Sequence, residues 1–124
     1  MTTFKSYRDL EVWRKAMRLA KRIYQVTRKF PTDERFGLTN QLRRAAVSVP
    51  SNIAEGHARF GAGESSRFLS IAMGSVAEIE TQILLSQDLR YLTEELIFEV
   101  LAELDIIGKM LRGLAKSIER RRHV

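Results

Sequence analysis

The C-terminal third of the chain carries an apolar repeat that limits what it can fold into. Apolar side chains recur there at alternating intervals of three and four residues, at Ile97, Val100, Leu104, Ile107, Leu111, Leu114 and Ile118. This spacing places all seven in one seam along roughly six turns of an α-helix. Such a seam is typical of a helix packed lengthwise against other helices. No segment has a comparable β-strand pattern, so we predict an all-α helical bundle.

Turn and cap residues divide the chain into four predicted helices, over about residues 9–29, 33–58, 64–90 and 94–119. Ser6 or Asp9 would cap the first helix, Thr32 or Asp33 the second and Thr93 the fourth. Phe30 and Pro31 separate the first two helices, because the residue before a proline leaves the helical region. A glycine-rich loop from Gly56 to Gly63 separates the second from the third. The 124 residues predict one domain, 1–124.

Proline interrupts the second predicted helix. The apolar period continues through Pro50, although a proline inside a helix removes a hydrogen bond and costs about 3 kcal/mol. The helix therefore either kinks near Pro50 or stops and restarts at Ser51. We favour a kink.

Positive charge is concentrated in the first half of the sequence. Residues 1–62 hold 13 Lys and Arg against 5 Asp and Glu, whereas residues 63–124 hold 8 against 10. The net charge is +6. This asymmetry predicts a basic face suited to a polyanion such as nucleic acid. An anionic lipid or an acidic protein could use the same face.

The first helix supplies most of that basic face. Its cations lie opposite its apolar side on a helical wheel, and few acidic residues accompany them. A purely solvating face usually mixes both signs of charge. Such rows contact phosphates with little base specificity. The predicted nucleic-acid-binding residues are Arg14, Arg18, Lys21, Arg22, Arg28, Lys29, Arg43 and Arg44.

Apolar surface also exceeds what one bundle needs. The apolar arc of the first helix covers about half its wheel, and Phe98 and Ile106 lie off the seam of the fourth helix. Large exposed apolar patches are uncommon in soluble monomers. We therefore expect the protein to self-associate.

Nothing in the sequence predicts an enzyme, a metal site or a cofactor. The chain has no cysteine, and its two histidines, His57 and His123, have no zinc-ligand spacing. Gly61 and Gly63 precede a helix but lack the strand and lysine of a phosphate-binding loop. No charge-free run approaches the ~20 residues that span a bilayer, so no membrane partner is expected. The absence of cysteine fits a cytoplasmic location.

One block of the sequence resembles a known family. The block is Arg43-Arg44-Ala45-Ala46-Val47-Ser48-Val49-Pro50-Ser51-Asn52-Ile53-Ala54-Glu55-Gly56, and Tyr7 to Trp13 and Arg67 to Ala72 fit the same pattern. It resembles the four helix bundle proteins, also described as 23S ribosomal RNA intervening-sequence proteins. The resemblance covers nearly the whole chain. A related protein is the accessory protein of diversity-generating retroelements.

The resemblance implies an up-down antiparallel four-helix bundle that forms a homo-oligomeric ring, often a pentamer. The retroelement relative forms a positively charged pentameric barrel that partners a reverse transcriptase and its RNA. Together with the charge asymmetry, this leads us to expect a non-enzymatic bundle that binds nucleic acid, with RNA as the favoured form. The alternative is a protein–protein adaptor or structural oligomer whose basic face docks an acidic partner.

Overall fold

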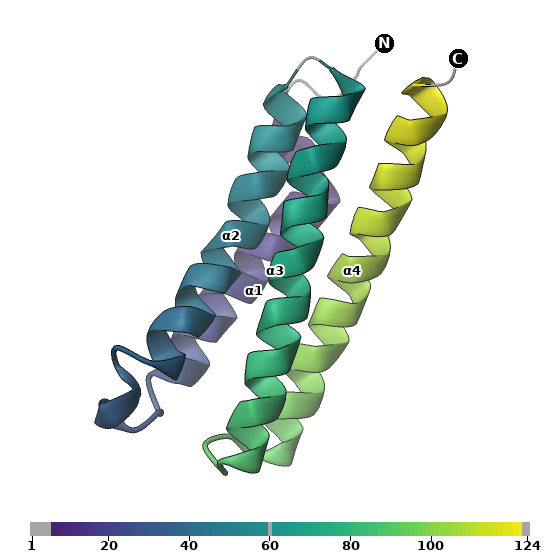
Figure 1. Cartoon of the computed structure of the whole chain (residues 1–124). Coiled ribbons are helices and arrows are strands. Elements are labelled where there is room, and N and C mark those ends of the chain that lie inside the picture. The colour runs from purple at the N-terminus through teal and green to yellow at the C-terminus, as the bar shows by residue number, and fades with distance from the viewer. Residues whose placement is uncertain (1–5, 60, 123–124) are drawn as a thin grey trace.

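The fold was analysed in a computed structural model that describes residues 6–59 and 61–122. Four long helices make up these residues: α1 (Glu11–Thr27), α2 (Leu38–Ala58), α3 (Ala62–Asp88) and α4 (Glu94–Arg122). Short 3-10 turns at Tyr7–Asp9 and Thr32–Glu34 precede α1 and α2, and no strand occurs in the described ranges. The helices run alternately up and down (Figure 1). The all-α, four-helix prediction is therefore confirmed.

The predicted seam of α4 faces the core. Six of its seven side chains are buried, and only Leu114 is partly exposed. They meet fully buried side chains from the other three helices, among them Leu19, Ile23, Leu42, Ile53, Ile79 and Ile83. Burial of each such side chain stabilises the fold by about 1.5–3 kcal/mol. The core thus explains the helical repeat from which the fold was predicted.

The second helix begins about five residues later than predicted, at Leu38. Thr32 and Asp33 belong to the 3-10 turn instead, so the prediction that they cap α2 is wrong. Gly37 separates that turn from the helix, with φ and ψ near −111° and −114°. The Glu34 carboxylate accepts a hydrogen bond of 3.0 Å from the Leu38 N–H and so caps the helix from outside it.

The helix α2 continues through Pro50 without a break. The proline is buried inside the α-helix, so a stop and restart at Ser51 is wrong, and the kink stays a prediction. Polar contacts surround the next turn, where Asn52 Nδ2 donates to the Ser48 carbonyl at 2.8 Å and to its hydroxyl at 2.9 Å. The Ser75 hydroxyl of α3 donates to the Ser48 hydroxyl at 2.8 Å. The bond between Ser75 and Ser48 therefore joins α3 to α2, whereas the Asn52 bonds lie within α2.

The turn between α3 and α4 is closed by hydrogen bonds at both ends. The Arg90 N–H donates to the Gln87 carbonyl and the Tyr91 N–H to the Ser86 carbonyl, each at 2.9 Å, the paired bonds of a Schellman motif. Arg90 adopts a φ of +63° there. The Thr93 hydroxyl then accepts from the Leu96 N–H at 3.2 Å, which confirms Thr93 as the cap of α4.

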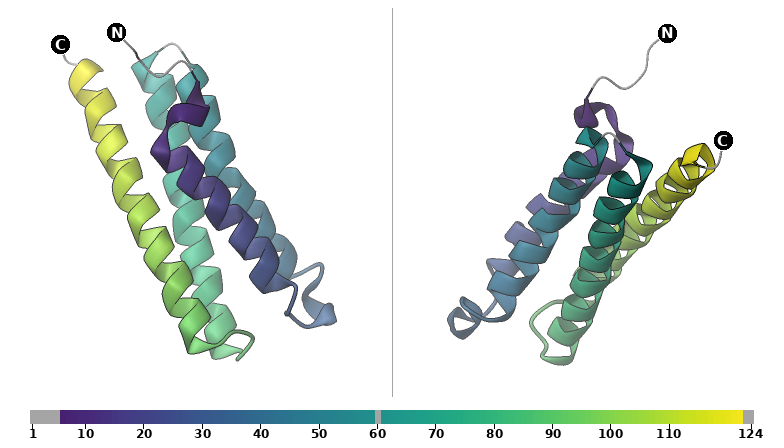
Figure 2. Two further views of the ribbon diagram at one scale, coloured as in Figure 1. Left: turned by 180° about the vertical axis from the view of Figure 1, so that it is seen from behind. Right: turned by 45° about the horizontal axis from the view of Figure 1, so that its top comes forward.

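The four helices do not pack equally closely. Of the neighbouring pairs, α1 and α4 make the fewest contacts, and α2 and α3 make the most. The C-terminal half of α4 stands apart from the other helices in each view (Figures 1 and 2). The bundle is therefore open along the side between α1 and α4.

The helix α3 is apolar on more than its buried side. It is the one described helix long and apolar enough to cross a membrane by length and composition, with a mean hydropathy of 1.3 over an 18-residue window within Gly63–Asp88. Helices that pass this test also occur in the cores of soluble proteins, and α3 packs here against both α2 and α4. Its large exposed apolar side chains are Ile71 and Leu85, which share one side of the helix, and Leu84, which lies on another. We refer to these three residues as the α3 outer patch.

Candidate nucleic-acid interface

Helix α1 buries one side and turns its cations away from the core. Its buried residues include Ala16, Leu19 and Ile23, which lie three to four residues apart. Among the predicted binding residues, Arg14, Arg18, Lys21, Arg28 and Lys29 are exposed, whereas Arg22 is half-buried. The predicted separation of charge on α1 is therefore present in the structure.

The half-buried Arg22 is engaged by α4. Its guanidinium pairs with the Glu99 carboxylate and lies 3.0 Å from Glu103 Oε1. Partial burial raises the pKa of Glu103 above its ordinary value, against the lowering effect of the positive charge on Arg22. Arg22 therefore stabilises the contact between α1 and α4, and it is less free for a phosphate than the sequence indicated.

Arg14 is partly engaged at the start of α1. Its Nε donates to the Arg8 carbonyl at 2.8 Å, and its Nη2 lies 3.9 Å from Asp9 Oδ1. Both groups of this ion pair are about half exposed, so the pair contributes little to stability and can exchange for a ligand.

Arg43 reaches across from α2 to the C-terminal end of α1. Its Nε donates to the Thr27 hydroxyl at 2.9 Å, and its Nη2 donates to the Tyr24 carbonyl at 3.3 Å. Its guanidinium also lies over the Tyr24 ring, 4.7 Å from the ring centroid. A cation at the carbonyl end of a helix offsets its negative partial charge. Arg43 therefore has a structural role that the sequence did not indicate.

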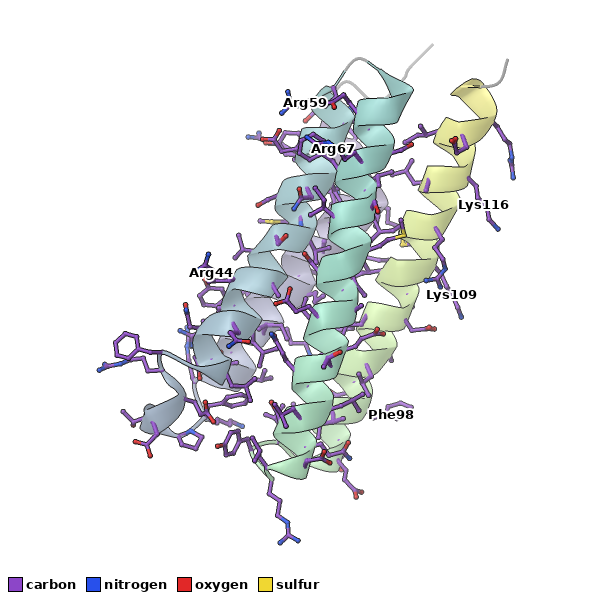
Figure 3. All side chains as sticks on the ribbon, in the orientation of Figure 1. Arg44, Arg59, Arg67, Phe98, Lys109 and Lys116 are labelled. Carbon is purple, nitrogen blue, oxygen red and sulfur yellow. The ribbon has the colours of Figure 1, made fainter. Side chains whose placement is uncertain are left out.

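Arg44 lies on a different side of α2 from Arg43. It shares a stripe with Gln41 and Ser48, which bond to Gln82 and Ser75 of α3. It is exposed and projects from α2 in Figure 3. The structure thus brings Arg43 to α1 and leaves Arg44 on the exposed outer side of α2, where it projects away from α3 (Figure 3).

Besides Arg44 of α2, four of the predicted cations remain exposed and have no carboxylate within ion-pair distance among the described residues. We call them the α1 basic row: Arg18, Lys21, Arg28 and Lys29. Arg18, Lys21 and Arg28 lie at intervals of three and seven residues on one stripe of the helix, with Gln25 between the last two. Arg18 and Lys21 lie within α1, whereas Arg28 and Lys29 follow directly after its last residue, Thr27.

The open side of the bundle contains a groove that the sequence did not predict. It has a volume of about 450 Å³ and is lined by Lys15, Arg18, Lys21, Arg22 and Gln25 of α1 and by Glu103, Ile106 and Ile107 of α4. The α1 cations were identified from the sequence. Their position beside Ile106 depends on the register between two helices about 90 residues apart in the chain.

A second feature that the sequence missed lies in the loop after α1. Phe36 is 83% exposed, and the Arg35 guanidinium lies 5.0 Å from the centroid of its ring. The predicted helix 33–58 included both residues, which hid their exposure. An arginine beside an exposed aromatic ring is a pair that can contact an unstacked base.

Among the side chains of residues 6–59 and 61–120 that the structure describes, no group of three His, Cys, Asp or Glu could hold a metal ion. His57, the one described histidine, is exposed near the end of α2. The nearest carboxylate in sequence, Glu55, pairs with Arg59 at 2.8 Å.

The described residues thus form a four-helix bundle with four exposed cations, on and directly after its first helix, that make no ion pair among these residues. The chain belongs to the 23S rRNA-intervening sequence protein family, which matches residues 8–113. No curated protein matches the sequence. The chain is similar to a solved protein of unknown function from the S23 ribosomal protein family of Bacteroides thetaiotaomicron, with 24% identity and a TM-score of 0.77. The match covers 85% of this chain and 98% of that one, and it supports the fold alone.

Proposed function

We propose that this protein is a non-enzymatic, cytoplasmic bundle protein that assembles with copies of itself and binds RNA through the α1 basic row. The observation that carries the proposal is the set of four exposed cations without described carboxylate partners, two on α1 and two directly after its C-terminal end. Cations placed in this way release counterions when they meet phosphates, which is the main source of sequence-independent affinity. Membership of a family named for an intervening sequence of ribosomal RNA adds support for RNA as the polyanion.

The test is a double charge reversal within the row. Arg18→Glu together with Lys21→Glu removes two cations that make no described ion pair, so the bundle stays folded. We expect the affinity for a single-stranded RNA to fall about tenfold or more. Arg22 is unsuitable for this test because Arg22→Glu would place a third carboxylate beside Glu99 and Glu103.

The matched control reverses two cations elsewhere. Lys109→Glu with Lys116→Glu changes the net charge by the same amount, and both lysines project from the outer side of α4 (Figure 3). The control variant should bind RNA more tightly than the α1 variant. Equal losses in both variants would mean that net charge alone, and not the α1 basic row, determines binding.

Self-assembly is the second part of the proposal and is supported by the α3 outer patch. Leu84 and Leu85 are each 46% exposed and Ile71 is 42% exposed, an unusual amount of aliphatic surface for one helix. Light scattering should therefore give a mass above that of one 14.3 kDa chain, and a pentamer is the expected state. Ile71→Glu with Leu85→Glu should reduce the mass toward one chain. A wild-type protein that is already monomeric would contradict this part.

An adaptor role is the alternative, in which the basic row docks an acidic protein. A pull-down with and without nuclease separates the two functions. RNA binding predicts that recovered material disappears after nuclease treatment. Recovery of one protein regardless of nuclease would support the adaptor.

A further inference from the structure

The groove between α1 and α4 combines a cationic wall with an exposed aliphatic side chain. Its α1 wall carries Lys15, Arg18 and Lys21, whereas its α4 wall contributes Ile106, which is 47% exposed. A solvated cationic face has no need of an aliphatic side chain beside it. A ligand that covers both walls must present negative charge and an apolar surface together.

We propose that this groove binds a short segment of single-stranded nucleic acid, with phosphates on Lys15, Arg18 and Lys21 and an unstacked base against Ile106. The inference rests on the proposed function and narrows it to one groove and one form of nucleic acid. A duplex keeps its bases stacked inside and presents mainly phosphates and sugars to a convex helix. A single strand exposes the flat faces of its bases next to its phosphates, which matches the two walls.

The dimensions of the groove fit a few nucleotides. Its α1 wall runs from Lys15 to Gln25, which is about 15 Å along the helix. Lys15, Arg18 and Lys21 lie three residues apart in sequence and make no described ion pair, so each is available to a phosphate. Apolar side chains form one face of the pockets in which other proteins hold extruded bases.

Glu103, the single carboxylate among the residues that line the groove, indicates which base the groove would prefer. Glu103 holds Arg22 through Oε1 at 3.0 Å, and its side chain remains about one-third exposed. A carboxylate repels a phosphate but accepts hydrogen bonds from the amino group of a base, as acidic side chains do with cytosine. The position beside Ile106 is thus suited to a base, and oligocytidine should bind more tightly than oligouridine.

The test is fluorescence anisotropy with labelled twelve-nucleotide oligocytidine, the matching oligouridine and a twelve-base-pair RNA duplex. Ile106→Gln keeps the size and charge of the site but removes its aliphatic surface. It should weaken oligocytidine binding about fivefold or more, since contacts of a base with a side-chain surface contribute on this scale. Duplex binding should not change.

The matched control is Phe98→Gln on the same helix. Phe98 is 75% exposed and does not line the groove (Figure 3), so this variant should bind all three RNAs like the wild type. Glu103→Gln provides a second readout, because it should reduce the preference for oligocytidine. Ile106 is half-exposed, so its variant should keep the wild-type helical signal in circular dichroism.

Three results would overturn the inference. They are an equal loss of oligocytidine affinity in Phe98→Gln and Ile106→Gln, tighter binding of the duplex than of either single strand, or displacement of oligocytidine by an acidic helical peptide at a lower concentration than unlabelled oligocytidine requires.

The proposed function has its own readout. If Arg18→Glu with Lys21→Glu abolishes binding while Ile106→Gln has no effect, the basic row binds RNA and only the base site is wrong. If the wild type binds none of the three RNAs, the proposed function fails as well.

Discussion

The Tyr91 hydroxyl donates a hydrogen bond of 2.9 Å to Glu34 Oε2 and so joins the two connections at one end of the bundle. The other oxygen of the same carboxylate accepts from the Leu38 N–H at 3.0 Å. The Tyr91 ring also packs against Phe30, with ring centroids 5.2 Å apart. A single carboxylate thus links the loop before α2 to the loop before α4.

This link predicts a dependence of stability on pH. The hydrogen bond from the Leu38 N–H, followed by that from Tyr91, lowers the pKa of Glu34 below 4.5. A lowered pKa stabilises the folded state above the unfolded-state pKa, and this contribution is lost as the pH falls through the folded-state value. Glu34→Gln should therefore be less stable than the wild type at pH 6, with a smaller difference at pH 3. Urea unfolding of both proteins at pH 6 and at pH 3 gives the difference in the free energy of unfolding. The same difference at the two pH values would contradict the prediction.

A second prediction concerns Arg90, which occupies a left-handed conformation after α3 with φ near +63°. Glycine is the usual residue at this position of a Schellman motif, since a side chain there costs about 1 kcal/mol. Arg90→Gly should raise the free energy of unfolding by about that amount. Arg90→Ala removes the same charge without relieving the strain and should give no comparable gain in thermal denaturation.

A third prediction compares two glycines in helices. A Cβ atom at Gly56 would lie 3.2 Å from Phe68 Cβ and 3.3 Å from the Ser65 carbonyl oxygen of α3, whereas a Cβ at Gly113 would meet nothing within 4 Å. Gly56→Ala should therefore destabilise the bundle by about 1–3 kcal/mol through overpacking. Gly113→Ala should stabilise it by about 1 kcal/mol, because alanine favours the helix. The same sign for both variants in urea unfolding would contradict this assignment.

A fourth prediction separates structural from binding arginines. Arg22→Met leaves the partly buried Glu103 without its partner and should cost about 1–2 kcal/mol of stability. Arg18→Met removes an exposed cation with no described ion pair and should change stability by less than about 0.5 kcal/mol. RNA binding should show the reverse order, with the larger loss in Arg18→Met.

The sequence predicted the fold well because the period of the apolar residues directly reflects burial. The seam from Ile97 to Ile118 is buried except at Leu114, which is partly exposed although Leu111 and Ile118 on either side of it are buried. The start of α2 was predicted poorly because Thr32 and Asp33 are good cap residues in either a 3-10 turn or an α-helix. Local preferences cannot separate these two outcomes.

The candidate site was predictable only within single helices. The cations on and directly after α1 follow from the period of this one segment, and four of them are exposed without an ion pair among the described residues. The engagement of Arg22 by Glu99 and Glu103, and the position of Ile106 beside Lys15 and Arg18, depend on how α1 and α4 align. Arg43 and Arg44 are adjacent in sequence, yet a rotation of 100° per residue places them on different flanks.

The most direct test of the account is the salt dependence of single-stranded RNA binding by the wild type and by Lys21→Gln. Each phosphate neutralised contributes about −0.7 to the slope of log K against log salt concentration. The account predicts a wild-type slope of about −2 or steeper, a slope shallower by about 0.7 in Lys21→Gln, and no change in Lys116→Gln. A wild-type slope near zero, or the same change in both variants, would contradict the claim that the α1 basic row holds the phosphates.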